Sequence, residues 1–120
     1  MPRILIAEDD PASRELLWEL LTAYDYSVIE TSNGQEALQK IHEERPDLVL
    51  LDIQMPVLDG LEVVRRLRND ARFLDLPVVA LSAYAMRGDH DNGLNAGFNA
   101  YLTKPIDAAA LRSEIERLLA

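Results

Sequence analysis

The chain contains no cysteine, which excludes a disulfide framework, a thiolate metal site and thiol redox chemistry. It also lacks an apolar run long enough to cross a bilayer. The N-terminal segment reaches its first acidic residue at Glu8, too early for the apolar region of a signal peptide. These absences predict a cytoplasmic protein that does not contact a membrane.

Basic residues are scarce, since 12 Lys and Arg stand against 21 Asp and Glu and leave a formal net charge of -9. Such a charge opposes the phosphate backbone, so direct nucleic-acid binding is not expected. The 120 residues are 48% hydrophobic, which is enough for one continuous core. We therefore expect a single domain over residues 1–120, with no output domain.

Five short apolar segments recur along the chain and read as strands. They are rich in Val, Ile and Leu and show no in–out alternation, as in parallel strands that are covered on both faces. The segments are ILIA from Ile4, SVIE from Ser27, DLVLLD from Asp47, PVVALS from Pro77 and AYLT from Ala100.

Stretches with helical spacing separate and follow these segments. Short polar residues that can cap free amides precede several of them, namely Asp10 (before Pro11), Asn33, Asp59 and Asp107. The fourth stretch is weaker, because Gly88 and Gly93 each cost about 1 kcal/mol relative to Ala inside a helix. We expect it to be the most mobile segment, and we expect Gly97 to end it in a left-handed conformation.

This alternation predicts an α/β fold, a doubly wound (βα)5 parallel sheet with helices on both faces. The flavodoxin-like strand order 2-1-3-4-5 is the common solution at this size. In such a fold the carboxyl ends of all strands lie at one edge, where ligands bind.

Polar residues gather after the predicted strands, at this same edge. Glu8, Asp9 and Asp10 follow the first strand, Asp52 ends the third, Ser82 ends the fourth and Lys104 follows the fifth. Carboxylates that meet in a low dielectric repel one another unless a cation intervenes, and ligands that offer only oxygen favour Mg²⁺ or Ca²⁺.

A hard cation beside a carboxylate, a hydroxyl and a lysine suits phosphoryl transfer. Asp52 could attack phosphorus and form an aspartyl phosphate, while Lys104 and Ser82 hold the phosphoryl oxygens. Taken singly, each residue has a plainer interpretation as a turn, loop or strand-end group. Asp10 is best explained as a helix cap, and His42 and His90 as surface residues.

Four motifs, in order and at the right spacing, resemble the receiver domain of two-component response regulators. They are ILIAEDDP, VLLDIQMPVLDG, VVALSAYA and AYLTKPI, and the resemblance runs from about Ile4 to Leu119. The chain is particularly similar to phosphorelay receivers, both stand-alone ones and those fused to hybrid sensor kinases.

This resemblance implies that Asp52 accepts a phosphoryl group from a phosphohistidine. It implies that Glu8, Asp9 and Asp52 hold Mg²⁺ together with the backbone carbonyl of Gln54. Ser82 and Lys104 would contact the phosphoryl group. Glu8 and Ser82 stand where many family members have Asp and Thr, and both substitutions keep the chemistry.

The same resemblance implies a conformational switch through Ser82 and Tyr101, which would change the surface of the fourth helix, fifth strand and fifth helix. Gln54 and Tyr84 occupy positions that tune the phosphoryl lifetime. The expected partners are a histidine kinase or histidine phosphotransfer protein and a downstream protein, with the chain a monomer or weak dimer. The signal would leave by onward phosphoryl transfer or by phosphorylation-dependent docking, unless the chain is a module of a longer protein.

Three other functions compete with this interpretation. A haloacid-dehalogenase-like phosphatase needs a second Asp two residues after the nucleophile, where this chain has Gln54. A flavodoxin-like electron carrier would place an FMN phosphate beside Glu8, Asp9 and Asp10, which would repel it. A degenerate receiver that acts only as a binding module is disfavoured because every expected site residue is present. A self-phosphorylating and self-dephosphorylating switch is preferred to a turnover enzyme.

Overall fold

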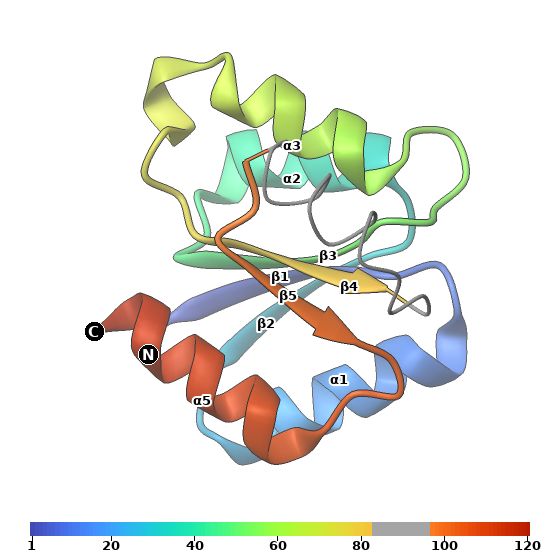
Figure 1. Ribbon diagram of the computed structural model, residues 1–120, viewed down its shortest axis with the longest axis vertical. Coiled ribbons are helices and arrows are strands. Elements are labelled where there is room, and N and C mark those ends of the chain that lie inside the picture. Colours follow the sequence, from blue (N-terminus) through green and yellow to red (C-terminus); the bar gives the residue numbers. More distant parts are fainter. Residues whose placement is uncertain (83–96) are drawn as a thin grey trace.

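A five-stranded parallel sheet forms the centre of the computed structural model, which describes residues 1–82 and 97–120 (Figure 1). Its strand order is β2-β1-β3-β4-β5. This confirms the predicted order 2-1-3-4-5. The strands are β1 (Arg3–Ala7), β2 (Ser27–Thr31), β3 (Leu48–Asp52), β4 (Val78–Ser82) and β5 (Ala100–Thr103).

Helices cover both faces of the sheet, as the sequence predicts. The elements α2 (Gly34–Glu44) and α3 (Gly60–Arg68) lie on one face, whereas α1 (Pro11–Ala23) and α5 (Ala108–Leu119) lie on the other (Figure 1). A short 3-10 helix, η1 (Ala71–Phe73), follows α3. The fourth stretch, with Gly88, Gly93 and His90, lies outside the described residues.

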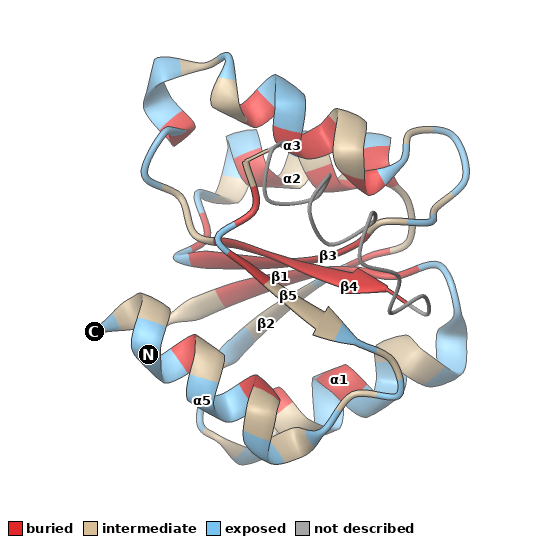
Figure 2. Cartoon of the chain, in the orientation of Figure 1, coloured by how far each residue is buried: buried red, intermediate tan, exposed pale blue. Residues whose placement is uncertain are grey.

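The central strands are buried on both faces, which explains why their sequences do not alternate. Leu5 and Ala7 of β1 belong to the core beneath α2 and α3, while Ile4 and Ile6 belong to the core beneath α1 and α5. All four side chains are fully buried, and burial extends along the middle of the sheet (Figure 2).

The predicted helix caps are confirmed. The side chain of Asp10 accepts a hydrogen bond from the amide of Ser13. Asn33, Asp59 and Asp107 likewise accept hydrogen bonds from backbone amides in the first turns of α2, α3 and α5. The helix starts are thus satisfied by local side chains, which explains why they can be read from sequence. Gly97 has a φ of +116°, so it adopts the predicted positive φ.

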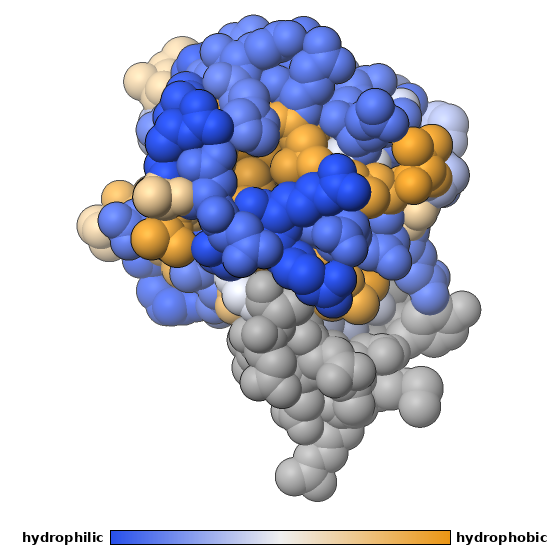
Figure 3. All heavy atoms as spheres, turned by 90° about the horizontal axis from the view of Figure 1, so that it is seen from above, coloured by the Kyte–Doolittle hydropathy of each residue, from blue (hydrophilic) through white to orange (hydrophobic). Residues whose placement is uncertain are grey.

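The outer surface over α2 and α3 is mostly hydrophilic, with apolar patches between the polar side chains (Figure 3). Within the described ranges, no helix has both the length and the apolarity that a bilayer crossing requires.

Candidate functional site

Three carboxylates meet at the carboxyl edge of the sheet. Glu8 follows β1 and Asp52 ends β3, and these two strands pair so that Ala7 lies opposite Leu51. Glu8 is 0% exposed and Asp52 is 4% exposed, whereas Asp9 faces solvent. Ligand oxygens of Glu8, Asp9 and Asp52 all lie within 4.8 Å of one another. Parallel pairing therefore brings together residues that lie more than forty positions apart.

Lys104 supplies the positive charge of this cluster. Its Nζ donates to Oε2 of Glu8 over 2.6 Å and to Oδ2 of Asp52 over 2.9 Å. The residue follows β5, and its backbone amide donates to the carbonyl of Ser82 over 2.6 Å. The Lys104–Pro105 peptide bond is cis. The lysine side chain thus reaches from the far side of β4 to the carboxylates of β1 and β3.

Burial sets the electrostatics of the cluster. Desolvation raises the pKa of Glu8 to about 7, because the hydrogen bond from Lys104 only partly offsets burial and Asp52 adds repulsion. Burial alone would lower the pKa of Lys104, but its bonds to Glu8 and Asp52 outweigh this effect and raise it. Lys104 therefore stays charged, while Glu8 holds a proton more readily than an ordinary glutamate.

The residues after Asp52 fold back onto it. The backbone amide of Gln54 donates to Oδ1 of Asp52 over 3.0 Å, and the amide of Ile53 donates to the carbonyl of Leu81 over 3.0 Å. Asp52 Oδ1 is thereby held by the chain's own backbone while Oδ2 faces Lys104.

The remaining predicted residues fall into two groups. Ser82 ends β4, is 2% exposed and lies in register with Thr103. Tyr101 is half-buried on β5 and packs against the core beneath α2 and α3. Both therefore lie on strands next to or near the cluster. Tyr84 lies outside the described residues.

Sequence reasoning missed one neighbour of the cluster. Arg14 of α1 donates from Nη1 to the backbone carbonyl of Glu8 over 2.9 Å. An arginine in the second turn of an amphipathic helix is common and carries no specific signal. Only the path of the loop between β1 and α1 reveals this contact.

The donor set fits a hard divalent cation. Three carboxylates and one ammonium carry a net charge of -2 when all are ionised, which one divalent ion would balance. All the candidate ligand atoms are oxygens, which suits Mg²⁺ or Ca²⁺ better than zinc.

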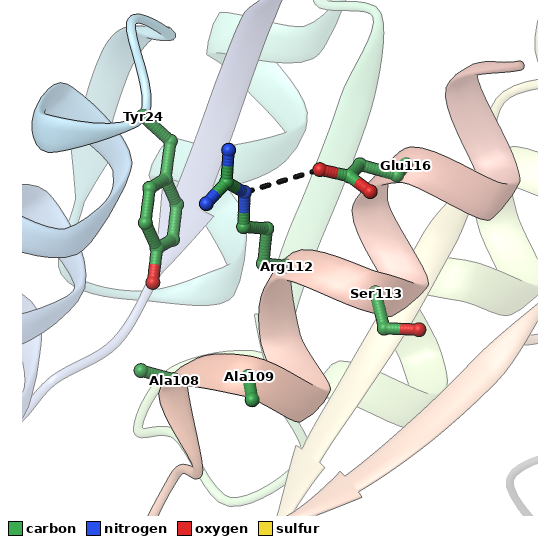
Figure 4. A pocket seen from close by; sticks show the side chains of 6 residues that line it. All are labelled: Tyr24, Ala108, Ala109, Arg112, Ser113 and Glu116. Atoms are coloured by element: carbon green, nitrogen blue, oxygen red, sulfur yellow. Dashed lines mark hydrogen bonds and ion pairs between the residues drawn. The ribbon is translucent and has the colours of Figure 1, made fainter.

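A surface hollow of about 550 Å³ lies away from the carboxylate cluster and is lined by none of the site residues named above. It lies between Tyr24 at the end of α1 and the first turns of α5 (Figure 4). The guanidinium of Arg112 stacks 4.7 Å from the centre of the Tyr24 ring and bonds Glu116 over 3.1 Å. The buried carboxylates, not a large cavity, define the candidate site.

The sequence of this chain is similar to those of known proteins. The model of the response regulator receiver domain family matches residues 4–116. The chain is 40% identical over 120 residues to the polar-differentiation response regulator DivK of Brucella anthropi, across 99% of this chain and 98% of the relative. It is 38% identical over 116 residues to DivK of Brucella ovis, across 97% of this chain and 94% of the relative.

Solved structures of similar proteins have the same fold as this chain. A response regulator from Chloroflexus aurantiacus has a TM-score of 0.95 at 31% identity, over 98% of this chain and 97% of that one. The receiver domain of the sensor histidine kinase PA1611 from Pseudomonas aeruginosa has a TM-score of 0.92 at 34% identity, over 98% and 97% of the two chains. That domain has a magnesium ion coordinated in its active-site cleft. The present chain belongs to the receiver domain family of two-component response regulators.

Proposed function

We propose that this receiver accepts a phosphoryl group on Asp52 from a phosphohistidine and acts as a signalling switch. The observation that carries the proposal is the position of the Asp52 carboxylate. It lies at the end of β3, within ion-pair distance of Lys104 and next to Glu8 and Asp9. A carboxylate in this position is nucleophilic, oriented and close to groups that can balance the incoming charge.

The transfer requires one bond to form and one to break. A carboxylate oxygen of Asp52 attacks phosphorus while the phosphorus–nitrogen bond of the donor breaks, and the imidazole leaves with the electron pair of that bond and takes a proton from solvent water. Lys104 already lies 2.9 Å from Asp52 Oδ2, so its ammonium can follow the charge onto the phosphoryl oxygens. Later attack by water would return the carboxylate and release inorganic phosphate, and we propose that this self-dephosphorylation resets a switch rather than serving turnover of a substrate.

Mg²⁺ would be held by Glu8, Asp9 and Asp52, with the carbonyl of Gln54 as a further ligand. When bound, the ion supplies charge neutralisation between the nucleophile and the phosphoryl oxygens. The magnesium-bound receiver from Pseudomonas aeruginosa supports this assignment, as does the cluster of three carboxylates.

The output would be a change in the surface of the segment before β5, of β5 and of α5. Ser82 and Tyr101 are the proposed switch residues. Their positions support this role, because Ser82 ends the strand next to Asp52 and Tyr101 lies on the following strand. A downstream protein would read this surface, and the lifetime of the signal would depend on Gln54 and Tyr84.

The donor would be a histidine kinase or a histidine phosphotransfer protein. A small apolar hollow of about 100 Å³ lies beside the site, between the first turns of α1 and the loop after β5. Its lining includes Leu16, Lys104 and Ile106, and Leu16 is 45% exposed. An apolar side chain of the donor that enters this hollow would hold the phosphohistidine near Asp52.

The DivK relatives suggest how the signal leaves. The chain covers 98% of the length of DivK from Brucella anthropi, which is itself called a response regulator. We propose that the output of this chain is a protein contact or onward phosphoryl transfer. An excised module of a longer protein would require the same chemistry at Asp52.

The proposal is tested by incubation with acetyl phosphate, with and without Mg²⁺, followed by intact mass measurement. We expect a metal-dependent gain of one phosphoryl group that Asp52→Asn abolishes. Asp59→Asn is a matched control, because Asp59 caps α3 outside the cluster. A mass gain that persists in Asp52→Asn would assign the acceptor to another residue.

A further inference from the structure

Arg14 reaches from α1 back over the loop that joins β1 to α1. Its Nη1 donates to the carbonyl oxygen of Glu8 over 2.9 Å, and its Nε lies 3.9 Å from Oε1 of Glu30. Glu30 is on β2, the edge strand next to β1. The side chain of Arg14 is 25% exposed. Its guanidinium is therefore held between the edge of the sheet and the loop that carries the acidic residues.

The carbonyl that Arg14 binds belongs to the peptide unit between Glu8 and Asp9. A peptide unit is planar, so a fixed carbonyl also fixes the direction in which the chain enters Asp9. Further hydrogen bonds hold the residues on either side of this peptide unit. The amide of Glu8 donates to the carbonyl of Thr31 over 3.1 Å, and the amide of Asp10 donates to Oε1 of Glu8 over 3.3 Å. Arg14 thus holds the peptide unit that joins two adjacent acidic residues of the cluster.

We propose that Arg14 is a positioning residue for the divalent-ion site. It orients the Asp9 carboxylate toward Glu8 and Asp52 through the backbone. The contacts given above for its guanidinium are to the Glu8 carbonyl and to Glu30, not to these three carboxylates. This inference rests on the proposed function, because it assumes that the three carboxylates bind an ion. It assigns to a side chain of α1 a role in metal affinity that the carboxylate cluster alone does not reveal.

The direction of the effect separates positioning from charge. As a nearby cation, Arg14 repels Mg²⁺, so the loss of its charge alone would tighten binding. As a positioning residue it favours binding, so its loss would weaken affinity. Partners that orient metal ligands typically change metal affinity by about 10- to 100-fold when mutated. The two effects therefore predict changes of opposite sign.

The test is calorimetric titration of the full chain with Mg²⁺ at constant ionic strength. We expect Arg14→Gln to weaken binding by about 10-fold or more. Arg14→Lys should fall between this variant and the wild type, because an ammonium cannot reproduce the guanidinium fork toward Glu8 and Glu30. Arg112→Gln is the charge-matched control, since Arg112 lies on α5 and pairs with Glu116. It should bind Mg²⁺ at least as tightly as the wild type.

A second readout needs no metal. The amide of Asp10 donates to Glu8 Oε1, so its hydrogen exchange, measured without added Mg²⁺, should be faster in Arg14→Gln than in the wild type. Arg112→Gln should leave this exchange rate unchanged.

Unchanged or tighter Mg²⁺ binding by Arg14→Gln would overturn the inference, even if the variant melted at a lower temperature. If Arg14→Gln does not fold, Arg14→Lys decides, and wild-type affinity in that variant would overturn the inference equally. A wild-type chain that binds no Mg²⁺ contradicts the proposed function itself. Normal wild-type binding with unaffected Arg14 variants contradicts only the role of Arg14.

Discussion

Gly60 packs directly against the backbone of Asp52. A Cβ at Gly60 would lie 2.5 Å from the Asp52 carbonyl oxygen and 2.8 Å from the Cα of Ile53. The amide of Gly60 also donates to the carbonyl of Ile53 over 2.9 Å. The first turn of α3 therefore rests on the residue that we propose as the phosphoacceptor.

Gly60→Ala should destabilise the protein and disturb the site together. The new methyl group must displace backbone, which a well-packed core resists at a cost of about 1–3 kcal/mol. We expect urea unfolding to show this loss and acetyl phosphate labelling to slow. Glu19→Ala on the exposed face of α1 is the control and should change stability by less than about 0.5 kcal/mol. Wild-type stability in Gly60→Ala would show that the close approach relaxes freely.

The pKa of Glu8 makes stability depend on pH. Its pKa of about 7 in the folded protein exceeds the ordinary value of 4.5, so the folded chain holds a proton that the unfolded chain releases. Without Mg²⁺, the contribution of Glu8 to the free energy of unfolding is therefore full below about pH 4.5 and falls as the pH rises to about 7. Between low pH and the pH above that range, the free energy of unfolding of the wild type should therefore fall by roughly 1 to 3 kcal/mol relative to that of Glu8→Gln.

Urea titrations of both proteins from pH 4 to pH 8, with a chelator present, would measure this difference. Parallel stability profiles for the wild type and Glu8→Gln would contradict the raised pKa. Added Mg²⁺ should reduce the wild-type loss at high pH, because an ion that binds only the folded chain stabilises it.

Arg68 joins the end of α3 to the chain before β5. Its guanidinium donates to the carbonyl of Phe73 over 2.7 Å, to the carbonyl of Gly97 over 3.0 Å and to Oδ1 of Asn99 over 2.8 Å. Burial lowers its pKa. Because Arg68→Ala removes three hydrogen bonds at about 1 kcal/mol each, we expect it to cost about 3 kcal/mol.

Chemical denaturation measures this loss, with Arg65→Ala as control. Arg65 pairs with Glu62 on the same helix but is 62% exposed, so its loss should cost at most about 1 kcal/mol. Arg68→Lys should recover little, because an ammonium cannot reach the three acceptors with one fork. Equal effects of Arg68→Ala and Arg65→Ala would contradict this assignment.

Val57 adopts a conformation that its side chain disfavours. Its φ is 69°, and the amide of Leu58 donates to the carbonyl of Pro56 over 2.7 Å, which closes a tight turn around it. The side chain is 73% exposed, so its loss removes little packing. Asn tolerates positive φ better than a β-branched residue. Val57→Asn should therefore increase the free energy of unfolding by about 1 kcal/mol and raise the melting temperature. Val57→Thr keeps the β-branch and should give no gain; equal stability of the two variants would exclude backbone strain as the cause.

Tyr101→Ala separates chemistry from switching. Tyr101 packs against the core beneath α2 and α3 and does not belong to the carboxylate cluster. We expect metal-dependent labelling of Asp52 to remain largely intact, while the acetyl phosphate-induced amide shifts of β5 and α5 become smaller. Loss of labelling would instead place Tyr101 in the transfer step.

Local patterns determined the parts of this protein that depend on neighbouring residues. Unalternating apolar runs predict parallel strands that are covered on both faces, and Asp10, Asn33, Asp59 and Asp107 cap helices through contacts within four residues. The order of strands along the chain then placed Glu8, Asp52 and Lys104 at one edge of the sheet. That much follows from periodicity, capping chemistry and the rules of parallel connection.

Tertiary structure alone decided which charges meet and how tightly. Lys104 pairs with both Glu8 and Asp52, 96 and 52 positions away, and Arg14 binds a carbonyl that the loop turns toward it. Arg68 likewise reaches Asn99 across 31 positions. Such contacts depend on the three-dimensional paths of loops and on burial. Burial strongly changes the free energy of a charged group, and a local sequence pattern does not predict it.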